Sequence, residues 1–220
     1  MNTRTPLDST PTDKATEGRK PSRKERAEET RARLVESAIA LFSERGYHET
    51  TVQSISERAG VAKGTFFVHF VTKDALLLGV LAEYISSAER ARDESLAHGA
   101  NPEETISAIF AAHAEQFGRS SPFMRACYSA TLASHDLAKA TNELFELVRK
   151  MLVAEIARGQ STGKFRADIS PVEAALAISS LYIGVSLSYS MMTNAPPLKT
   201  MFQPMLELAM KSFCPRATAH

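Results

Sequence analysis

Apolar residues recur along most of this chain at intervals of three and four residues, which is the spacing of one face of an α-helix. The sequence contains no run of strict apolar–polar alternation bounded by turn residues, and no internal repeat. The pattern therefore predicts an all-α protein. The expected helices are residues 28–45, two short helices within 51–70, and then 73–96, 102–117, 122–132, 136–158, 171–192 and 198–213.

Residues 51–70 predict two short helices joined by a tight turn. Thr50 or Thr51 can cap the first helix, because a hydroxyl there can accept a hydrogen bond from a free first-turn N–H group. Gly60 ends that helix, since a left-handed backbone is readily adopted only by glycine. Two short helices joined in this way form the unit that places its second helix in the DNA major groove.

Residues 171–192 form the most apolar stretch, and no charged residue lies between Glu173 and Lys199. About 20 uncharged residues are enough to cross a bilayer, so a membrane span has to be considered. Several serines lower the hydropathy and no basic segment adjoins the stretch, so we interpret it as a buried helix. A helix that is apolar on nearly all sides is covered on nearly all sides, and a second copy of the chain could supply part of that cover.

Composition and charge narrow the picture only slightly. The formal net charge is +1, which by itself indicates neither a nucleic-acid nor a membrane partner. Residues 1–26 contain three prolines and almost no apolar side chains, so we expect a disordered, weakly basic tail. Such a tail is either inert or an arm that reaches the DNA minor groove. The two cysteines have no metal or redox spacing and the N-terminus is polar, so a cytoplasmic protein is expected.

Residues 59–76 read AGVAKGTFFVHFVTKDAL, and this stretch resembles the signature of the TetR family of transcriptional regulators. Ala62 stands where a capping serine is usual, which is expected to cost roughly 1 kcal/mol of helix stability. Phe67 stands where tyrosine is usual, so a hydroxyl that could reach a phosphate is missing. The matching residues are Thr51, Ile55, Ala59, Gly60, Val61, Lys63, Gly64, Thr65, His69, Phe70, Lys73 and Leu76.

The resemblance implies an all-α protein with an N-terminal three-helix helix-turn-helix DNA-binding head and a larger C-terminal body for ligand binding and dimerisation. We expect the tail at 1–26, the head at 27–73 and the body at 74–220. The implied function is sequence-specific transcriptional regulation, by a repressor that a small, largely apolar effector releases from its operator. The implied partners are a pseudo-palindromic operator in double-stranded DNA, a second copy of the chain and the effector, with no membrane partner and no cofactor.

The family pattern also implies which residues meet DNA. Lys63 could bond guanine, and Thr65 or Val68 could contact a thymine methyl group. Gln53 could pair with adenine or reach a phosphate, while Thr51 and Lys73 would bind phosphate and so fix the register. A core position for His69 is an equal alternative. The expected DNA-binding residues are Thr51, Gln53, Lys63, Gly64, Thr65, Phe67, Val68, His69 and Lys73.

Two further sets of residues are expected in the body. Apolar side chains with a few hydroxyl groups or an imidazole are what a small-molecule site requires, although each of these residues could also be plain core. The expected ligand-binding residues are Phe110, His113, Phe117, Met124, Tyr128, Tyr182 and Met191. The expected dimer-interface residues are Leu181, Gly184, Val185, Ser188, Met205 and Leu208.

Catalysis and metal binding are not expected. The segment GQSTGKF at residues 159–165 resembles a phosphate-binding loop, but its glycine spacing is too short and a helix precedes it where a strand is needed. No nucleophile motif or metal-ligand spacing is present among the reactive side chains. Those side chains are His113, Glu115, Arg125, Cys127, His135 and Asp136.

Two alternatives to an effector-controlled regulator remain open. The first is a DNA-binding or architectural protein that has no effector and is controlled through a protein partner, for which a filled body would be evidence. The second is a helical enzyme or carrier that has lost DNA binding, which the phenylalanine at position 67 would slightly favour.

Overall fold

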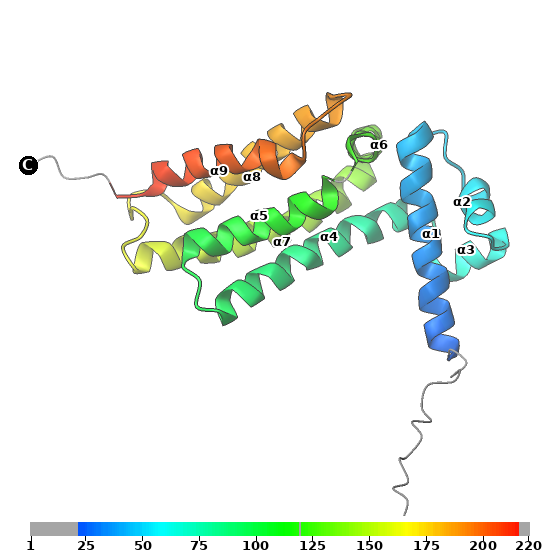
Figure 1. The fold of residues 1–220 in the computed structure, drawn as a ribbon, viewed down its shortest axis with the longest axis horizontal. Coiled ribbons are helices and arrows are strands. Elements are labelled where there is room, and N and C mark those ends of the chain that lie inside the picture. The colour runs from blue at the N-terminus through cyan, green and yellow to red at the C-terminus, as the bar shows by residue number, and fades with distance from the viewer. Residues whose placement is uncertain (1–21, 119, 216–220) are drawn as a thin grey trace, which may run out of the picture.

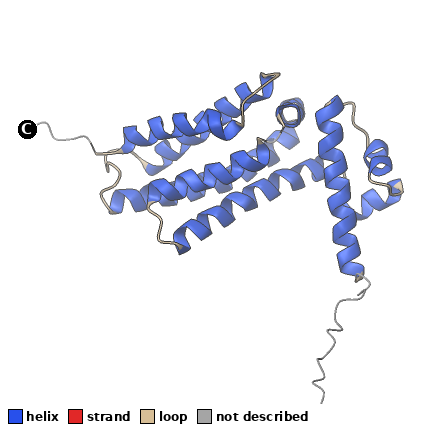
Figure 2. Cartoon of the chain, in the orientation of Figure 1, coloured by secondary structure: helices blue, strands red, loops and turns tan. Residues whose placement is uncertain are grey.

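The computed structural model describes residues 22–118 and 120–215, and every regular element in these ranges is a helix (Figure 2). The prediction of an all-α fold is therefore confirmed. Segments 102–117 and 198–213 have the predicted bounds, and the others differ by a few residues at their ends. The helices are α1 Arg23–Arg45, α2 Val52–Arg58, α3 Lys63–His69, α4 Lys73–Ala97, α5 Pro102–Phe117, α6 Ser121–Ala133, α7 His135–Ser161, α8 Pro171–Met191 and α9 Leu198–Phe213.

The helices form a small unit and a long bundle (Figure 1). Helix α1 crosses the end of the bundle, and α2 and α3 lie on the outer side of α1. Helix α4 runs from this small unit into the bundle, where it packs against α5 and α7. Helices α8 and α9 form a second layer over α5 and α7, and α6 lies between that layer and α1. Two helices, α4 and α6, thus connect the two parts.

Helix α1 begins at Arg23, five residues earlier than its apolar face predicts. Its first two turns are exposed, so no apolar periodicity marks them. Instead Ser22 and Glu25 form a capping box, in which each side chain accepts a hydrogen bond from the other's backbone N–H group. The expected tail therefore ends before residue 22, and its first 21 residues lie outside the described part of the chain.

One hydrophobic core runs from the small unit into the bundle. Leu34, Phe42 and Phe66 are buried among the first three helices. The Phe42 ring stacks on that of Phe123 of α6, with centroids 6.5 Å apart and an interplanar angle of 18°. A rotation of α1 relative to α6 would disturb this close packing, so the two parts are mechanically connected.

Helix α8 explains the most apolar stretch of the sequence. Among the described helices it alone has the length and hydropathy of a single membrane-spanning helix, and 44% of that window is buried inside the protein. It packs against α6, α7 and α9, as the core helix of a bundle does. Its remaining surface carries a stripe of exposed residues at four-residue intervals, consisting of Val172, Leu176, Ser180, Gly184 and Ser188.

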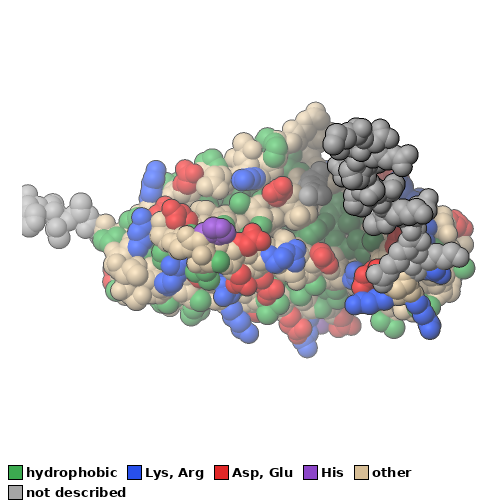
Figure 3. All heavy atoms as spheres, turned by 60° about the horizontal axis from the view of Figure 1, so that its bottom comes forward, with side chains coloured by type: hydrophobic (Ala, Val, Ile, Leu, Met, Phe, Trp, Pro, Cys, Tyr) green, Lys and Arg blue, Asp and Glu red, His purple; other side chains and the backbone are tan. Residues whose placement is uncertain are grey.

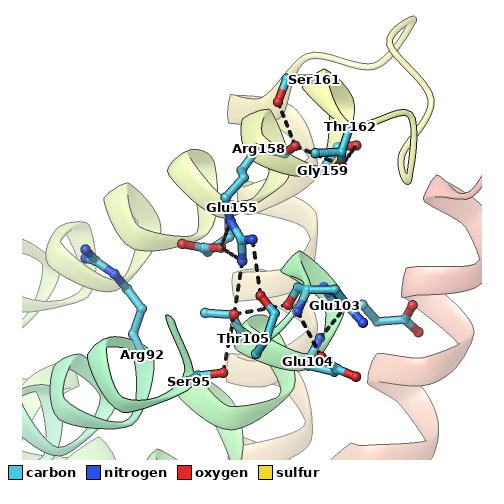
Figure 4. A network of polar contacts seen from close by, with 12 residues as sticks. Arg92, Ser95, Glu103, Glu104, Thr105, Glu155, Arg158, Gly159, Ser161 and Thr162 are labelled. Carbon is cyan, nitrogen blue, oxygen red and sulfur yellow. Dashed lines mark hydrogen bonds and ion pairs between the residues drawn. The ribbon is translucent and has the colours of Figure 1, made fainter. Parts of the chain in front are cut away.

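A polar network ties the bundle together at the end far from α1 (Figure 4). The carboxylate of Glu155 on α7 is buried and pairs with Arg158, whose Nη2 lies 2.6 Å from Glu155 Oε2. Arg158 also donates to Thr105 Oγ1 at 3.1 Å and to the carbonyl of Ala100 at 3.2 Å. This arginine therefore holds the α4–α5 connection against the end of α7.

Candidate functional site

The turn between α2 and α3 follows from two local interactions. Thr51 caps α2, because its hydroxyl accepts a hydrogen bond from the Ser54 backbone N–H at 3.1 Å. In return, the Ser54 hydroxyl accepts a hydrogen bond from the Thr51 backbone N–H. Gly60 follows α2 with φ of 67°, the left-handed conformation expected for it. The next helix starts after Ala62, which makes no side-chain capping bond, so the first turn of α3 depends on backbone and packing alone.

Helix α3 has a buried face and an outward face. Phe66 is fully buried, and Phe70, just beyond the helix, packs against it with ring centroids 5.7 Å apart. On the other side Phe67 is 51% exposed and Val68 is 80% exposed. An exposed apolar pair on a seven-residue helix suits a surface that a partner covers. The predicted residues on or beside this face are Lys63, Gly64, Thr65, Phe67 and Val68, of which Thr65 alone is half-buried.

The remaining predicted DNA-binding residues lie at the edges of this face. Thr51 is exposed at the start of α2, where its hydroxyl already serves as the cap. Gln53 is also exposed, and its amide donates to Glu57 Oε1 at 2.7 Å. His69 is half-buried at the end of α3, which is intermediate between the two positions expected for it.

Lys73 differs from the rest because its ammonium group is engaged inside the protein. Its Nζ donates to the backbone carbonyls of Tyr47 at 2.8 Å and Thr50 at 2.7 Å, and it lies 4.1 Å from the centroid of the Tyr47 ring. The Tyr47 hydroxyl donates to Asp74, and burial lowers the pKa of Lys73. We name these three residues the Lys73 clamp. This geometry favours an internal tie between the α1–α2 connection and α4 over the expected phosphate contact.

Charge gives no separate indication of the DNA-facing surface. In the view of Figure 3 acidic and basic side chains are interspersed over the bundle, without a broad area of one sign. In the small unit, Arg58 of α2 is paired with Glu44 of α1 at 2.7 Å. The outward face of α3 is therefore identified by the exposure of its side chains, and not by a strong electrostatic field.

Five of the seven expected ligand-binding residues line two small cavities in the bundle. The first, named here the His113 cavity, has a volume of about 20 Å³ and is lined by Ile109, Phe110, His113, Phe145, Val148, Ser179, Tyr182 and Ile183. The second, named the Thr141 cavity, has a volume of about 40 Å³ and is lined by Leu81, Phe117, Cys127, Tyr128, Thr131, Thr141 and Phe145. Either space holds little more than a water molecule or two, so the described body is nearly filled.

Two expected ligand-binding residues lie elsewhere. Met124 is fully buried in the core between α6 and its neighbours and lines neither cavity. Met191 is 70% exposed at the end of α8, although Tyr189 and Ser190 in the same turn are buried. Met191 therefore lines neither cavity, contrary to its expected place in the ligand site.

His113, Tyr182 and Tyr128 are hydrogen-bonded in the interior of the body. His113 Nδ1 lies 2.7 Å from the hydroxyl of Tyr182, and both residues are buried. Burial lowers the pKa of His113 to about 4 and raises that of Tyr182 well above its usual value, so both are neutral near pH 7. Tyr128 donates to the carbonyl of Ile183 and also contacts Ser186.

The expected dimer residues lie on the uncovered side of α8 and α9. Gly184 and Ser188 are exposed, and a side chain added at Gly184 would meet no atom within 4 Å. Met205 and Leu208 of α9 are 46% and 68% exposed, whereas Leu181 and Val185 are half-buried. Together with the stripe on α8, these side chains form a largely apolar face that no described residue covers.

The groups that could support catalysis are scattered. No three His, Cys, Asp or Glu side chains in the described ranges come together as metal ligands would. Cys127 is buried, and burial raises the pKa of its thiol, which makes it a poor nucleophile. In the GQSTGKF segment α7 continues to Ser161 and the ring of Phe165 packs over Gly159, so the segment is a helix–helix connection.

Comparison with known proteins identifies the family. Residues 34–80 match the model described as "Bacterial regulatory proteins, tetR family". The chain is 30% identical over 170 residues to the HTH-type transcriptional repressor DhaR of a Mycobacterium species, covering 76% of this chain and 86% of DhaR. The chain belongs to the TetR family of bacterial transcriptional regulators. It is accordingly a DNA-binding regulator and not an enzyme, as expected from the sequence.

Other TetR-family proteins extend the comparison. An uncharacterised regulator of Bacillus subtilis, YerO, is 28% identical over 151 residues, and the match covers 64% of this chain but about half, 51%, of YerO. The structure of Thermus thermophilus FadR in complex with lauroyl-CoA is 24% identical, with a TM-score of 0.66 over 86% of this chain and 98% of that one. That likeness establishes the shared fold of head and body.

The sequence did not reveal several residues that organise this TetR-family chain. Tyr47 and Asp74 complete the Lys73 clamp, and their pairing across 27 positions has no local signature. In the body, Thr141 and Phe145 line the cavities, and neither is among the ligand-binding residues expected from the sequence. Their spacing of four on the inner face of α7 was the available signal.

Proposed function

We propose that this TetR-family regulator is a homodimeric, cytoplasmic repressor that uses α3 to recognise a pseudo-palindromic operator. The observation that carries the proposal is the outward face of α3, where Phe67 and Val68 are exposed beside Lys63 and Gly64. An apolar side chain there can contact a thymine methyl group, and Lys63 can reach guanine O6 and N7 in the major groove. Gly64 permits close approach of the backbone to the DNA.

Different residues of the head take different tasks in this proposal. Lys63, Thr65 and Val68 read base edges, and Phe67 packs against the sugar–phosphate backbone without the hydroxyl usual there. Gln53, together with Thr51 and its α2 N-terminus, contacts phosphates and sets the register. Lys73 keeps the α2–α3 unit in position through its clamp and stays inside the protein. We place the head at residues 27–73 and the body at 74–220.

The second copy of the chain would cover the apolar face of α8 and α9. The small side chains at Ser180, Gly184 and Ser188 allow two copies of α8 to approach closely, and Met205 and Leu208 extend the contact onto α9. A two-fold axis through this face would pair identical surfaces, which closes the dimer. The dimer would carry two heads, as a palindromic operator requires.

The effector is proposed to be largely apolar. The walls of the His113 and Thr141 cavities carry no charged side chain, so they suit the apolar portion of a ligand. The relative whose structure contains lauroyl-CoA combines the same fold with a ligand that has a long apolar chain. A ligand that fits a spread-apart dimer better than the DNA-bound one lowers operator affinity by its differential binding to the two states.

The experiment is a titration of fluorescently labelled DNA from the region upstream of the chain's own gene, at several salt concentrations. Specific binding that falls steeply with salt, and that Thr65→Ala and Lys63→Ala weaken, supports the proposal. Binding that is weak, independent of salt and unaffected by both substitutions would refute operator recognition by α3. Adding lauroyl-CoA or free lauric acid to the bound complex tests the effector clause separately.

A second candidate function is a TetR-family regulator without an effector, controlled through a protein partner. It is favoured by one observation, the small volume of about 20 and 40 Å³ of the two body cavities. The candidates differ in a simple measurement. An effector-independent regulator keeps its operator affinity across a panel of apolar compounds, whereas an effector-controlled one loses affinity with at least one compound.

A further inference from the structure

The His113 cavity and the Thr141 cavity share one wall, which is the side chain of Phe145. Phe145 lies on α7 between Thr141, which lines one cavity, and Val148, which lines the other. These three residues occupy one face of the helix, since they are spaced by four and three positions. The two small spaces therefore lie next to each other along this face of α7, with Phe145 in the walls of both.

Among the described residues, the Phe145 ring is less enclosed by aromatic neighbours than the rings of Phe110 and Phe117. Phe110 lies 4.9 Å from Phe202 and 5.2 Å from Tyr182, and Phe117 lies 5.2 Å from Tyr84, all between ring centroids. Within the described ranges Phe145 makes no ring contact of this kind, and its side chain is half-buried. A change in its side-chain rotamer therefore disturbs fewer neighbouring rings than a change at Phe110 or Phe117 would.

The Thr141 cavity contains a buried polar atom that lacks a partner. Thr141 is 5% exposed, and its Oγ1 makes no hydrogen bond to any residue that the structure describes. Such a hydroxyl is costly in a dry interior, and a threonine in a helix usually avoids the cost by bonding the carbonyl four residues earlier. Here the hydroxyl lines the cavity instead, where a polar atom of a ligand could pair with it.

The walls also limit the charge of a ligand. The polar groups around the two cavities are hydroxyls, one thiol and a neutral imidazole, with no Lys, Arg, Asp or Glu side chain. An ionised group placed inside would lose its hydration without gaining a counter-ion. A chamber with these walls accepts an uncharged molecule, or the uncharged portion of a larger one.

We propose that Phe145 is a movable partition, and that its displacement joins the two cavities into one elongated chamber for an uncharged apolar ligand with a hydrogen-bonding group at the Thr141 end. This inference rests on the proposed function only for the ligand's role as effector. The chamber and its partition can be tested on the protein without DNA. A closed partition also accounts for a nearly filled body in a protein that binds a ligand.

The probe for the test is 1-octanol, with octylammonium as its charged counterpart of equal length, measured by isothermal titration calorimetry on the full chain. Wild type is expected to bind octanol but not octylammonium. If the open state is populated at about 1–10%, Phe145→Ala binds octanol about 10- to 100-fold more tightly. Thr141→Val, which keeps the shape and removes the hydroxyl, weakens octanol binding about two- to tenfold.

The thiol of Cys127 reports opening directly, because it lines the Thr141 cavity and is otherwise buried. In a Cys214→Ser background, the small uncharged reagent methyl methanethiosulfonate is expected to label Cys127 slowly in the parent. Phe145→Ala should raise the labelling rate about 10- to 100-fold, by the same population argument. Saturating octanol should lower the rate in both proteins, because it occupies the same space.

Three outcomes would overturn the proposal. In the first, neither Phe145→Ala nor Thr141→Val changes the affinity for octanol. In the second, Phe145→Ala binds octanol but the wild-type protein does not. In the third, the wild-type protein binds octanol and octylammonium with equal affinity. Circular dichroism and operator binding of each variant establish that it is folded. If one of these outcomes is found in a protein that still binds its operator, only the Phe145 partition is refuted. If the wild-type protein does not bind its operator, the proposed function is refuted.

Discussion

The two lysines of the recognition segment are expected to respond differently to substitution, although the sequence assigns both to DNA. Lys63 is exposed at the start of α3, whereas the ammonium group of Lys73 is bonded to two backbone carbonyls of the α1–α2 connection. We compare Lys63→Ala with Lys73→Met, which keeps an apolar stem in the place of the lysine stem. One change removes a charge from the DNA-facing surface, and the other removes the clamp.

The magnitudes follow from these positions. The logarithm of DNA affinity falls with the logarithm of salt by about 0.9 for each phosphate neutralised. The charge of Lys63 would add to this neutralisation beside its contact with a base edge, so losing Lys63 from both heads of the proposed dimer lowers the slope by up to about 1.8. Losing Lys73 leaves that slope unchanged. It removes two charge-assisted hydrogen bonds, each worth about 1.5–3 kcal/mol when fully buried. Because Lys73 is only half-buried, we expect a loss of about 2 kcal/mol in unfolding free energy.

The first assay is fluorescence anisotropy of labelled operator DNA between roughly 50 and 300 mM salt, where the effect of phosphate contacts on affinity is clear. The second is urea unfolding of each variant. Lys139, an exposed lysine of α7 in the body, gives a matched control in Lys139→Ala, which should change neither quantity. The reasoning is refuted if Lys73→Met lowers the salt slope as much as Lys63→Ala does while leaving stability intact. That result would return Lys73 to the phosphate-binding role expected from the sequence.

Three further predictions concern the body. Burial lowers the pKa of His113 from 6.5 to about 4, so between these two pH values the unfolded chain binds one more proton than the folded chain. Up to about 3 kcal/mol of unfolding free energy that is present above pH 6.5 is therefore lost as the pH falls to 4. His113→Phe should lack this pH-dependent loss in urea titrations across the same range. Arg158→Ala leaves the buried Glu155 carboxylate unpaired and should cost about 2 kcal/mol, and a double substitution of both residues by Met should recover most of it, as followed by thermal unfolding. Gly184→Leu should give monomers in light scattering, whereas Ala154→Leu on the exposed side of α7 should leave dimers, and dimeric Gly184→Leu would contradict the proposed interface.

Sequence periodicity could predict the helices because burial and period agree over most of the chain. Leu198–Phe213 is a clear case, since Phe202, Leu206 and Met210 are buried at four-residue spacing on one face. The start of α1 could not be found in this way, because its first turns are exposed and have no apolar period. The Ser22 and Glu25 pair was the only local sign among the described residues, and it is visible in the sequence as a capping box.

The outward position of Val68 on α3 could also be predicted, because a helix that buries Phe66 turns the residue two positions later to its opposite side. The role of Lys73 could not be predicted, because its partners are backbone carbonyls more than 20 positions away. Every residue has a backbone carbonyl, so the sequence does not mark which carbonyls accept these bonds. The partition at Phe145 was likewise hidden. Two cavities and their common wall depend on how five helices meet, which no single helix pattern contains.

The contacts of α6 explain how a change in the body can reach the head by a second route besides α4. The N-terminal turns of α6 are bonded to the end of α8, since Arg125 Nε donates to the carbonyl of Ser190 at 2.8 Å and Ser121 Oγ to that of Met192 at 3.1 Å. The same turns meet α1 through Phe123. A ligand that displaces Phe145 must push apart helices that line the cavities, among them α8, which also carries the proposed dimer face. Because interiors are close-packed, we expect α6 to transmit that displacement to α1, so that in the proposed dimer the spacing of the two heads would change with the space between α7 and α8.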